Sequence, residues 1–389
     1  RSGGMHYTSI ENIHKVIDPL FLDELKAELD EICANPVERT RTAKLRVFQR
    51  KLASLTFLDP ACGSGNFLTE TYLSLRRLEN KILVELSHGQ VTMYSASESP
   101  IQVSISQFYG IEINDFAVTV AKTALWIAES QMMKETEKIL LVPLEFLPLK
   151  TNAFIVEGNA LRVDWESVVP KSKLNYIMGN PPFVGARLMG KEQKADVNTI
   201  FPGWKNAGNL DYVCCWYKKA SDMMQGTSVR SALVSTNSVS QGESVANLWK
   251  PLFDDGVHID FAYRTFRWDS EAKIKAHVHC VIIGFSVAAS STPKKLFDGD
   301  RYQVANHING YLLDGENVFV ESRSKPICNV PEIGMGNQPI DNGQYLFEKE
   351  DMEAFIKKEP SAAAYFYPWY GAKEFISQKP RYCLWLGEC

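Results

Sequence analysis

The segment Asp59-Pro-Ala-Cys-Gly-Ser-Gly-Asn-Phe67 is a glycine-rich turn between two different periodic patterns. The apolar run 55–59 has the length of a short buried strand, and residues 65 to about 86 have helical periodicity. Gly63 and Gly65 allow the backbone to approach a ligand closely and to adopt positive φ values. A strand, a tight glycine turn and a helix in this order predict the first unit of a doubly wound α/β sheet, with a ligand at the turn.

The acid at the start of this turn indicates which ligand it suits. A dinucleotide fingerprint has a third glycine, but Leu68 occupies that position here. Asp59 would repel the pyrophosphate of such a ligand, whereas it would attract a cation. The turn therefore argues against a nicotinamide-dependent dehydrogenase and favours S-adenosylmethionine (SAM), which carries an ammonium and a sulfonium.

Strand-like and helical segments alternate after this turn, which predicts a mostly parallel, Rossmann-like sheet with right-handed crossovers. The expected strands are 108–112, 154–157, 174–179 and 231–235, and the expected helices are 116–133, 210–224 and 244–253. No helical pattern separates the last two apolar strands, 259–263 and 277–285. These two are therefore expected to form an antiparallel pair at one edge of the sheet.

Two later strand ends carry polar side chains that suit a nucleoside. Glu112 ends the 108–112 strand, where an acid can accept hydrogen bonds from both ribose hydroxyls. Asn159 follows the 154–157 strand and has an amide that can bond an adenine edge, although asparagine is also a common turn residue. Together with the glycine turn, these residues predict a nucleoside-containing ligand at the carboxyl edge of the sheet.

The segment Asn180-Pro-Pro-Phe183 directly follows an apolar strand. The two prolines restrict the backbone and remove two N–H donors, which leaves carbonyl groups that can face a ligand. The side-chain carbonyl of Asn180 and the backbone carbonyl of Pro181 can together accept from an exocyclic NH2 group. Phe183 offers a ring on which a planar base can stack. This combination predicts a site for a nucleobase taken out of its helix.

With these motifs in this order, the chain resembles the γ-class DNA adenine-N6 methyltransferases from about residue 4 to residue 285. The segment His6-Tyr-Thr-Ser9 is similar to the N-terminal motif of that family. The resemblance implies SAM as cofactor and double-stranded DNA as partner. It implies catalytic roles for Asn180, Pro181, Pro182 and Phe183. It also implies cofactor contacts from Tyr7, Thr8, Asp59, Ala61, Gly63, Gly65, Asn66, Phe67, Glu112, Ile113, Asn159 and Ala160.

A second resemblance concerns the segment Phe261-Ala-Tyr-Arg-Thr-Phe-Arg-Trp-Asp-Ser-Glu-Ala-Lys273 and the following His277-Val-His-Cys-Val-Ile-Ile-Gly. Both are similar to the type IIL, MmeI-like restriction–modification fusions. The resemblance implies that Phe266 or Trp268 stacks on the other face of the flipped base. It also implies that an endonuclease region and the rest of a target-recognition domain belong to a longer parent chain.

The domain organisation follows from these assignments. Residues 1–53 are expected to form a helical segment with the N-terminal cofactor motif, and residues 54–289 the catalytic domain. A linker and a partial target-recognition domain are expected over 290–389. The resemblance to the fusions and the absence of an initial Met predict that the chain is a piece of a longer protein.

Composition limits the function classes that remain. The net charge is −4 and the pI is about 6.1, so contact with nucleic acid must come from a local patch or from another part of the protein. The apolar runs are too short to span a membrane. The eight cysteines form no C-x-x-C pair, which predicts reduced thiols in a cytoplasmic protein without a zinc site.

Other activities use a similar site. Cytosine-N4 methyltransferases share the geometry, usually with Ser in place of Asn180, and protein-glutamine methyltransferases share the motif because their substrate also presents a planar NH2. A non-catalytic DNA-binding or specificity subunit on this fold is the alternative from another class. The long C-terminal extension favours DNA as substrate. A cytosine-C5 enzyme is excluded, because its nucleophile needs a Pro-Cys dipeptide and none occurs here.

Overall fold

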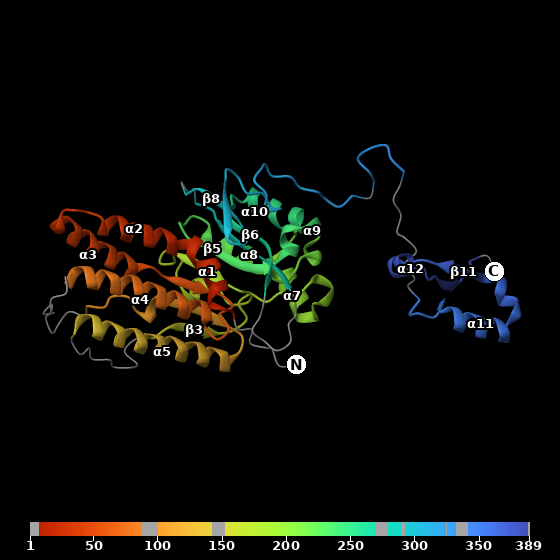
Figure 1. The fold of residues 1–389 in the computed structure, drawn as a ribbon, viewed down its shortest axis with the longest axis horizontal. Coiled ribbons are helices and arrows are strands. Elements are labelled where there is room, and N and C mark those ends of the chain that lie inside the picture. The colour runs from red at the N-terminus through yellow and green to blue at the C-terminus, as the bar shows by residue number, and fades with distance from the viewer. Residues whose placement is uncertain are drawn as a thin grey trace. The chain divides into compact units, whose positions relative to one another are not determined.

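The computed structural model describes residues 8–87, 100–141, 152–268, 278–288, 292–323, 325–331 and 341–387. The chain divides into two compact units, Arg1–Ser322 and Arg323–Cys389. The first unit is an α/β sheet with helices on both faces (Figure 1). The second unit is a small three-stranded sheet with helices.

In the described part of the first unit, the main sheet has nine strands in the order β3-β2-β1-β4-β5-β7-β6-β8-β9. The strands are β1 (Phe57–Asp59), β2 (Phe108–Glu112), β3 (Phe154–Glu157), β4 (Tyr176–Gly179), β5 (Arg230–Thr236), β6 (His258–Trp268), β7 (Val278–Ser286), β8 (Lys294–Asp298) and β9 (Arg301–Ala305). Strands β1 to β5 are parallel, and β7 is antiparallel to both β5 and β6. The predicted doubly wound α/β fold is confirmed.

The edge of this sheet differs from the prediction. Strands β6 and β7 form the expected antiparallel pair, but β8 pairs parallel to β6, and β9 completes an antiparallel hairpin at the edge. The ring of Phe297 in β8 stacks on Tyr263 in β6 at 4.2 Å between centroids, and Leu296 is buried. The prediction that β6 and β7 lie at the edge was therefore wrong. The sequence Lys294-Lys-Leu-Phe-Asp298 has only two apolar residues and gave little signal of a strand.

The side chains of the strands alternate between two hydrophobic clusters, one on each face of the sheet. One cluster joins the strands to α1 (Ile10–Ile17), the π-helical turn η1 (Asp18–Leu22), α2 (Asp23–Cys33), α3 (Glu38–Ser54), α4 (Asn66–Ser87) and α5 (Asp115–Leu140). The other joins them to α6 (Trp165–Val168), α7 (Lys191–Ile200), α8 (Cys214–Met224), η6 (Val245–Trp249) and α10 (Lys250–Asp254). In β5, for example, Ala232 and Val234 face the first cluster and Leu233 faces the second. No helix among the described residues is long and apolar enough to cross a membrane.

Short helical turns connect these elements. They are η2 (Ile105–Gln107), η3 (Ala186–Leu188), η4 (Ala207–Asn209), η5 (Asn237–Ser240) and α9 (Gly242–Ser244). In the second unit, β10 (Leu346–Phe347), β12 (Arg381–Leu384) and β11 (Phe366–Trp369) form an antiparallel sheet in that order. Its other elements are α11 (Lys349–Lys358), η7 (Pro360–Tyr365) and α12 (Ala372–Ser377). The rings of Phe347, Phe355 and Phe366 pack edge to face and form its small core.

A histidine links the N-terminal helix to α4. His14 Nδ1 lies 2.9 Å from Asp18 Oδ1, and His14 Nε2 lies 3.3 Å from Glu70 Oε1. Hydrogen bonds to Asp18 and Glu70 raise the pKa of His14 to about 9, although partial burial opposes the shift. The N-terminal helical segment is therefore held to the catalytic fold by a charge that depends on pH.

We expect this link to stabilise the fold below pH about 6.5, where the unfolded histidine is also protonated, and to be lost as the pH rises through about 9. His14→Gln should lower the free energy of unfolding by about 1 kcal/mol at low pH, after allowance for solvent screening, and by less at high pH. Urea unfolding of both proteins at several pH values measures this difference. A penalty that is constant with pH would show that the histidine acts by packing alone.

Candidate active site

The predicted site residues meet at the carboxyl ends of the central parallel strands. Asp59 ends β1, Glu112 ends β2, Asn159 follows β3 and Asn180 follows β4. Strand order reverses between β1 and β4, which pair side by side, so a crevice is expected at this edge. The fold therefore brings segments from four separate parts of the chain to one place.

Asp59 lies at the centre of this arrangement and is 1% exposed. Its Oδ1 accepts a hydrogen bond from the Ala61 N–H at 3.0 Å. Burial raises the pKa of Asp59 to about 8, and the nearby Glu112 adds to the shift while the Ala61 N–H opposes it. A buried acid with this pKa gains a charge readily when a cation binds beside it.

Asp59 also contacts Gly179, the last residue of the strand that precedes Asn180. A Cβ added to Gly179 would lie 2.4 Å from Asp59 Oδ1, so only glycine allows this contact. The backbone just before Asn180 is therefore packed directly on the Asp59 carboxyl. Gly179 was not predicted as a site residue, although its place at the end of an apolar strand, directly before Asn180, was the available signal.

The glycine turn leaves space where a ligand is expected. An added Cβ on Gly63, which has φ +54°, would meet no atom of the described residues within 4 Å, whereas on Gly65 (φ +82°) it would lie 2.9 Å from Ala121 Cβ. Gly65 thus allows the turn to pack on α5, and the described part of the chain leaves open space at Gly63. Asn66 begins α4 and accepts from Ser64, and Phe67 is buried.

Glu112 holds the same turn from the neighbouring strand. Its Oε2 accepts the Gly63 N–H at 2.9 Å, and its Oε1 accepts the Asn114 N–H at 3.0 Å. Each carboxylate oxygen has two lone-pair directions, so both retain capacity for a hydroxyl group. Ile113 beside it is 68% exposed, an unusual position for a large apolar side chain at a strand end.

The side-chain amide of Asn159 is hydrogen-bonded to other residues of the protein at both ends, which the sequence did not indicate. Its Nδ2 donates to Asp196 Oδ2 at 3.0 Å, and its Oδ1 accepts the Leu161 N–H at 2.9 Å. Both ends of the amide therefore hold the loop after β3. The carbonyl of the buried Ala160 accepts from Lys219 Nζ at 2.8 Å. Burial lowers the pKa of Lys219 to about 8.

Asn180 has a different environment. Its Oδ1 is buried and has no hydrogen-bond partner among the residues that the structure describes. Buried polar atoms nearly always have a partner, so this acceptor retains its capacity to bind a group that comes from outside the chain. Pro181 is buried and Pro182 exposed, and the half-buried Phe183 packs against both hydrophobic clusters.

The structure describes only some of the remaining predicted site residues. Thr8 is buried just before α1, and Tyr7 lies outside the described residues. Phe266 is half-buried, with its ring 5.4 Å from Lys15 Nζ and 6.4 Å from the Tyr263 ring. The side chain of Trp268 also lies outside what the structure describes. The choice between Phe266 and Trp268 therefore stays open.

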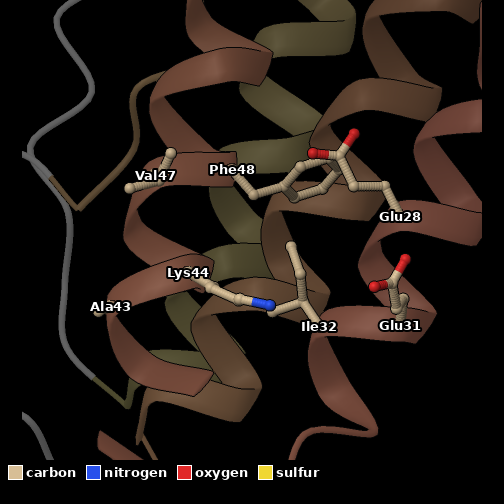
Figure 2. A pocket seen from close by; sticks show the side chains of 7 residues that line it. All are labelled: Glu28, Glu31, Ile32, Ala43, Lys44, Val47 and Phe48. Atoms are coloured by element: carbon tan, nitrogen blue, oxygen red, sulfur yellow. The ribbon is translucent and has the colours of Figure 1, made fainter. Parts of the chain in front are cut away.

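A separate hollow lies on the surface between α2 and α3 (Figure 2). It is lined by Glu28, Glu31, Ile32, Ala43, Lys44, Val47 and Phe48. None of the strand-end residues lines it, so it is not part of the site. In the described ranges, no group of three or more His, Cys, Asp or Glu side chains could hold a metal ion.

Comparison with known protein families identifies the family of this chain. A family model described as the MmeI DNA-methyltransferase domain matches residues 35–298, more than half of the chain. The chain belongs to the MmeI DNA-methyltransferase family. A second model, the MmeI target recognition domain, matches residues 314–389. The resemblance to MmeI-like enzymes that the motifs predicted is confirmed.

Individual relatives of this MmeI-family chain agree with the assignment. DNA methyltransferase A of Bacillus subtilis strain 168 is 43% identical over 390 residues, which cover 99% of this chain and 43% of that protein. The solved structure of the type IIL restriction-modification enzyme MmeI in complex with DNA matches with a TM-score of 0.92 and 42% identity, over 99% of this chain and 51% of that one. A putative type II restriction enzyme and methyltransferase of Methanocaldococcus jannaschii is 32% identical over 107 residues, 28% of this chain and 8% of that protein. The chain thus spans about half the length of MmeI and less of the Bacillus protein.

Proposed function

We propose that this chain carries the catalytic centre of a site-specific DNA adenine-N6 methyltransferase that uses SAM and belongs to a restriction–modification protein. The observation that carries the proposal is the buried Oδ1 of Asn180 beside the carboxyl edge of the sheet, which no described residue of the chain hydrogen-bonds. An amide acceptor in this position suits an exocyclic amino group. The family assignment and the target-recognition match support DNA as the source of that group.

The residues of the carboxyl edge fit SAM. The open space at Gly63 gives the ligand room, Glu112 offers acceptors for its ribose hydroxyls, and the buried Asp59 favours its positive charge. The loop of Asn159 and Ala160 borders the place expected for its adenine. When bound, SAM supplies a methyl group already activated for transfer by the sulfonium.

The chain's own residues would make adenine a better nucleophile. The N6 lone pair of adenine is delocalised into the ring. Asn180 Oδ1 and the Pro181 carbonyl accept the two N6 hydrogens, which favours a pyramidal nitrogen with an available lone pair. Phe183 holds the base plane by stacking, and Phe266 or Trp268 is proposed to cover the other face. Orientation supplies most of the acceleration, because no covalent intermediate with the protein is needed.

The direct test is to incubate the chain with unmethylated genomic DNA and SAM that carries an isotopically labelled methyl group. Mass spectrometry of the nucleosides separates N6-methyladenine from N4-methylcytosine, and sequencing of the product DNA maps the modified positions. Labelled N6-methyladenine at one repeated sequence supports the proposal. Label in cytosine, or in glutamine residues of an added protein extract, would replace it by one of the alternative activities.

A further inference from the structure

The segment after Phe183 is fixed by hydrogen bonds from residues far along the chain. The Val184 N–H donates to Asp211 Oδ1 at 3.0 Å, and the Val184 carbonyl accepts the Tyr212 N–H at 3.0 Å. The N–H and the carbonyl of Val184 are therefore both hydrogen-bonded, so the two peptide groups that flank its Cα are held. This pair of bonds fixes the backbone that carries Phe183.

Asp211 connects this segment to two further elements. The side chain is 8% exposed, its Oδ1 also accepts the Val213 N–H at 3.2 Å, and its Oδ2 accepts the Thr236 hydroxyl at 3.3 Å. Val213 directly precedes α8, and Thr236 ends β5. A single buried carboxylate thus joins the Phe183 segment, the start of α8 and the strand next to β4.

The sequence of the site explains why such a contact is needed. Pro181 and Pro182 have no N–H, so the backbone cannot donate a hydrogen bond at these positions. The peptide of Val184 is the first one after Phe183, and Asp211 is its acceptor. A hydrogen bond from a backbone N–H to a carboxylate is about twice as strong as one between neutral groups.

A second buried acid holds the cofactor side in a similar way. Asp196 Oδ2 accepts from Asn159 Nδ2 at 3.0 Å and from the Tyr212 hydroxyl at 2.8 Å, and its Oδ1 accepts from Arg162 Nε at 2.8 Å. Burial opposes ionisation, but these hydrogen bonds hold the pKa of Asp196 below its usual value. Asp211 and Asp196 therefore support different loops, and Tyr212 lies between them.

We propose that Asp211 is a positioning residue for the target base, acting through Val184 on the placement of Phe183. The inference rests on the proposed function, and it assigns to Asp211 the substrate side of the site rather than the cofactor side. Asp196 is a matched control, since it is a buried acid that accepts the Tyr212 hydroxyl in the same network but also binds the side chain of Asn159.

Three variants test this assignment. Asp211→Ala removes every acceptor, Asp211→Asn retains one oxygen for the Val184 N–H, and Asp196→Asn weakens the contact on the cofactor side. We expect Asp211→Ala to lower kcat about tenfold or more with SAM affinity within about twofold of wild type, because a misplaced ring costs orientation. Asp211→Asn should recover most of this loss, and Asp196→Asn should mainly weaken SAM binding.

Two readouts separate positioning from general support of the fold. A 2-aminopurine in place of the mapped target adenine reports whether the base leaves the helix, and its fluorescence change should be reduced in Asp211→Ala alone. Hydrogen exchange of the peptide that contains Val184 should be faster in Asp211→Ala and near wild type in Asp211→Asn. This second measurement needs neither DNA nor SAM, so it decides on the Val184 contact even if the proposed activity is absent. Unchanged exchange in Asp211→Ala would overturn the inference, as would equal losses of SAM affinity and kcat.

Discussion

Asn180→Ala is expected to abolish methyl transfer while SAM remains bound. The Asn180 Oδ1 is buried, accepts from none of the described residues and is the side-chain acceptor proposed for the amino group of the target base. Loss of one preorganised hydrogen-bonding group in an active site lowers the rate by about 10²–10³-fold. The loss should be in kcat, because the interaction forms with the reacting nitrogen rather than with the cofactor. Methylation rates on the mapped DNA site and calorimetric titration with SAM measure the two quantities.

Asn180→Ser is the informative companion variant. The serine side chain is shorter by one bond than that of asparagine, but its oxygen is still an acceptor. Cytosine-N4 methyltransferases usually have Ser at this position. Residual activity in Asn180→Ser with none in Asn180→Ala would show that an acceptor is what the reaction requires. If Asn180→Ala loses SAM binding together with activity, Asn180 supports the fold and the proposed role is wrong.

Asp59→Ala is expected to remove most of the SAM affinity. Asp59 is almost fully buried between the glycine turn and Gly179, where its charge would act on the ligand with little screening by water. Hydrogen bonds or close contacts to a charged group contribute about 1.5–3 kcal/mol, which corresponds to roughly a 10–150-fold weaker Kd. Calorimetric titration of Asp59→Ala beside Asn180→Ala gives a direct comparison, since only the first should fail to bind.

The raised pKa of Asp59 adds a pH dependence to this prediction. With a pKa of about 8, Asp59 is largely protonated in the free protein at neutral pH, and a bound cation favours its ionised form. SAM binding should then release a proton, so affinity should increase by up to about tenfold per unit as the pH rises from about 6 towards 7.5. Above this range the ammonium of the ligand itself loses its proton, which opposes the trend. Asp59→Asn should bind weakly with no such rise, and an identical rise in this variant would assign the proton to another group.

The sequence predicted the placement of those candidate site residues that are adjacent in the chain. The turn from Asp59 to Phe67 and the segment from Asn180 to Phe183 both end apolar strands, and parallel strands bring their carboxyl ends together. The network of Asp196, Tyr212 and Asp211 was not predicted, because its partners are 16 to 37 residues apart and no local pattern marks them. Strand β8 was missed because only two of its five residues are apolar, and its pairing with β6 comes from tertiary contacts.

The buried oxygen of Asn180 has an opposite effect on stability from the one proposed for it in catalysis. An unpartnered buried acceptor destabilises a folded protein by about 1–3 kcal/mol relative to a satisfied one. The protein without its substrate is therefore less stable locally at the residue proposed to bind the target amino group. Selection for thermal stability alone would favour an apolar residue at position 180, and such a protein would lack the acceptor proposed for the reaction.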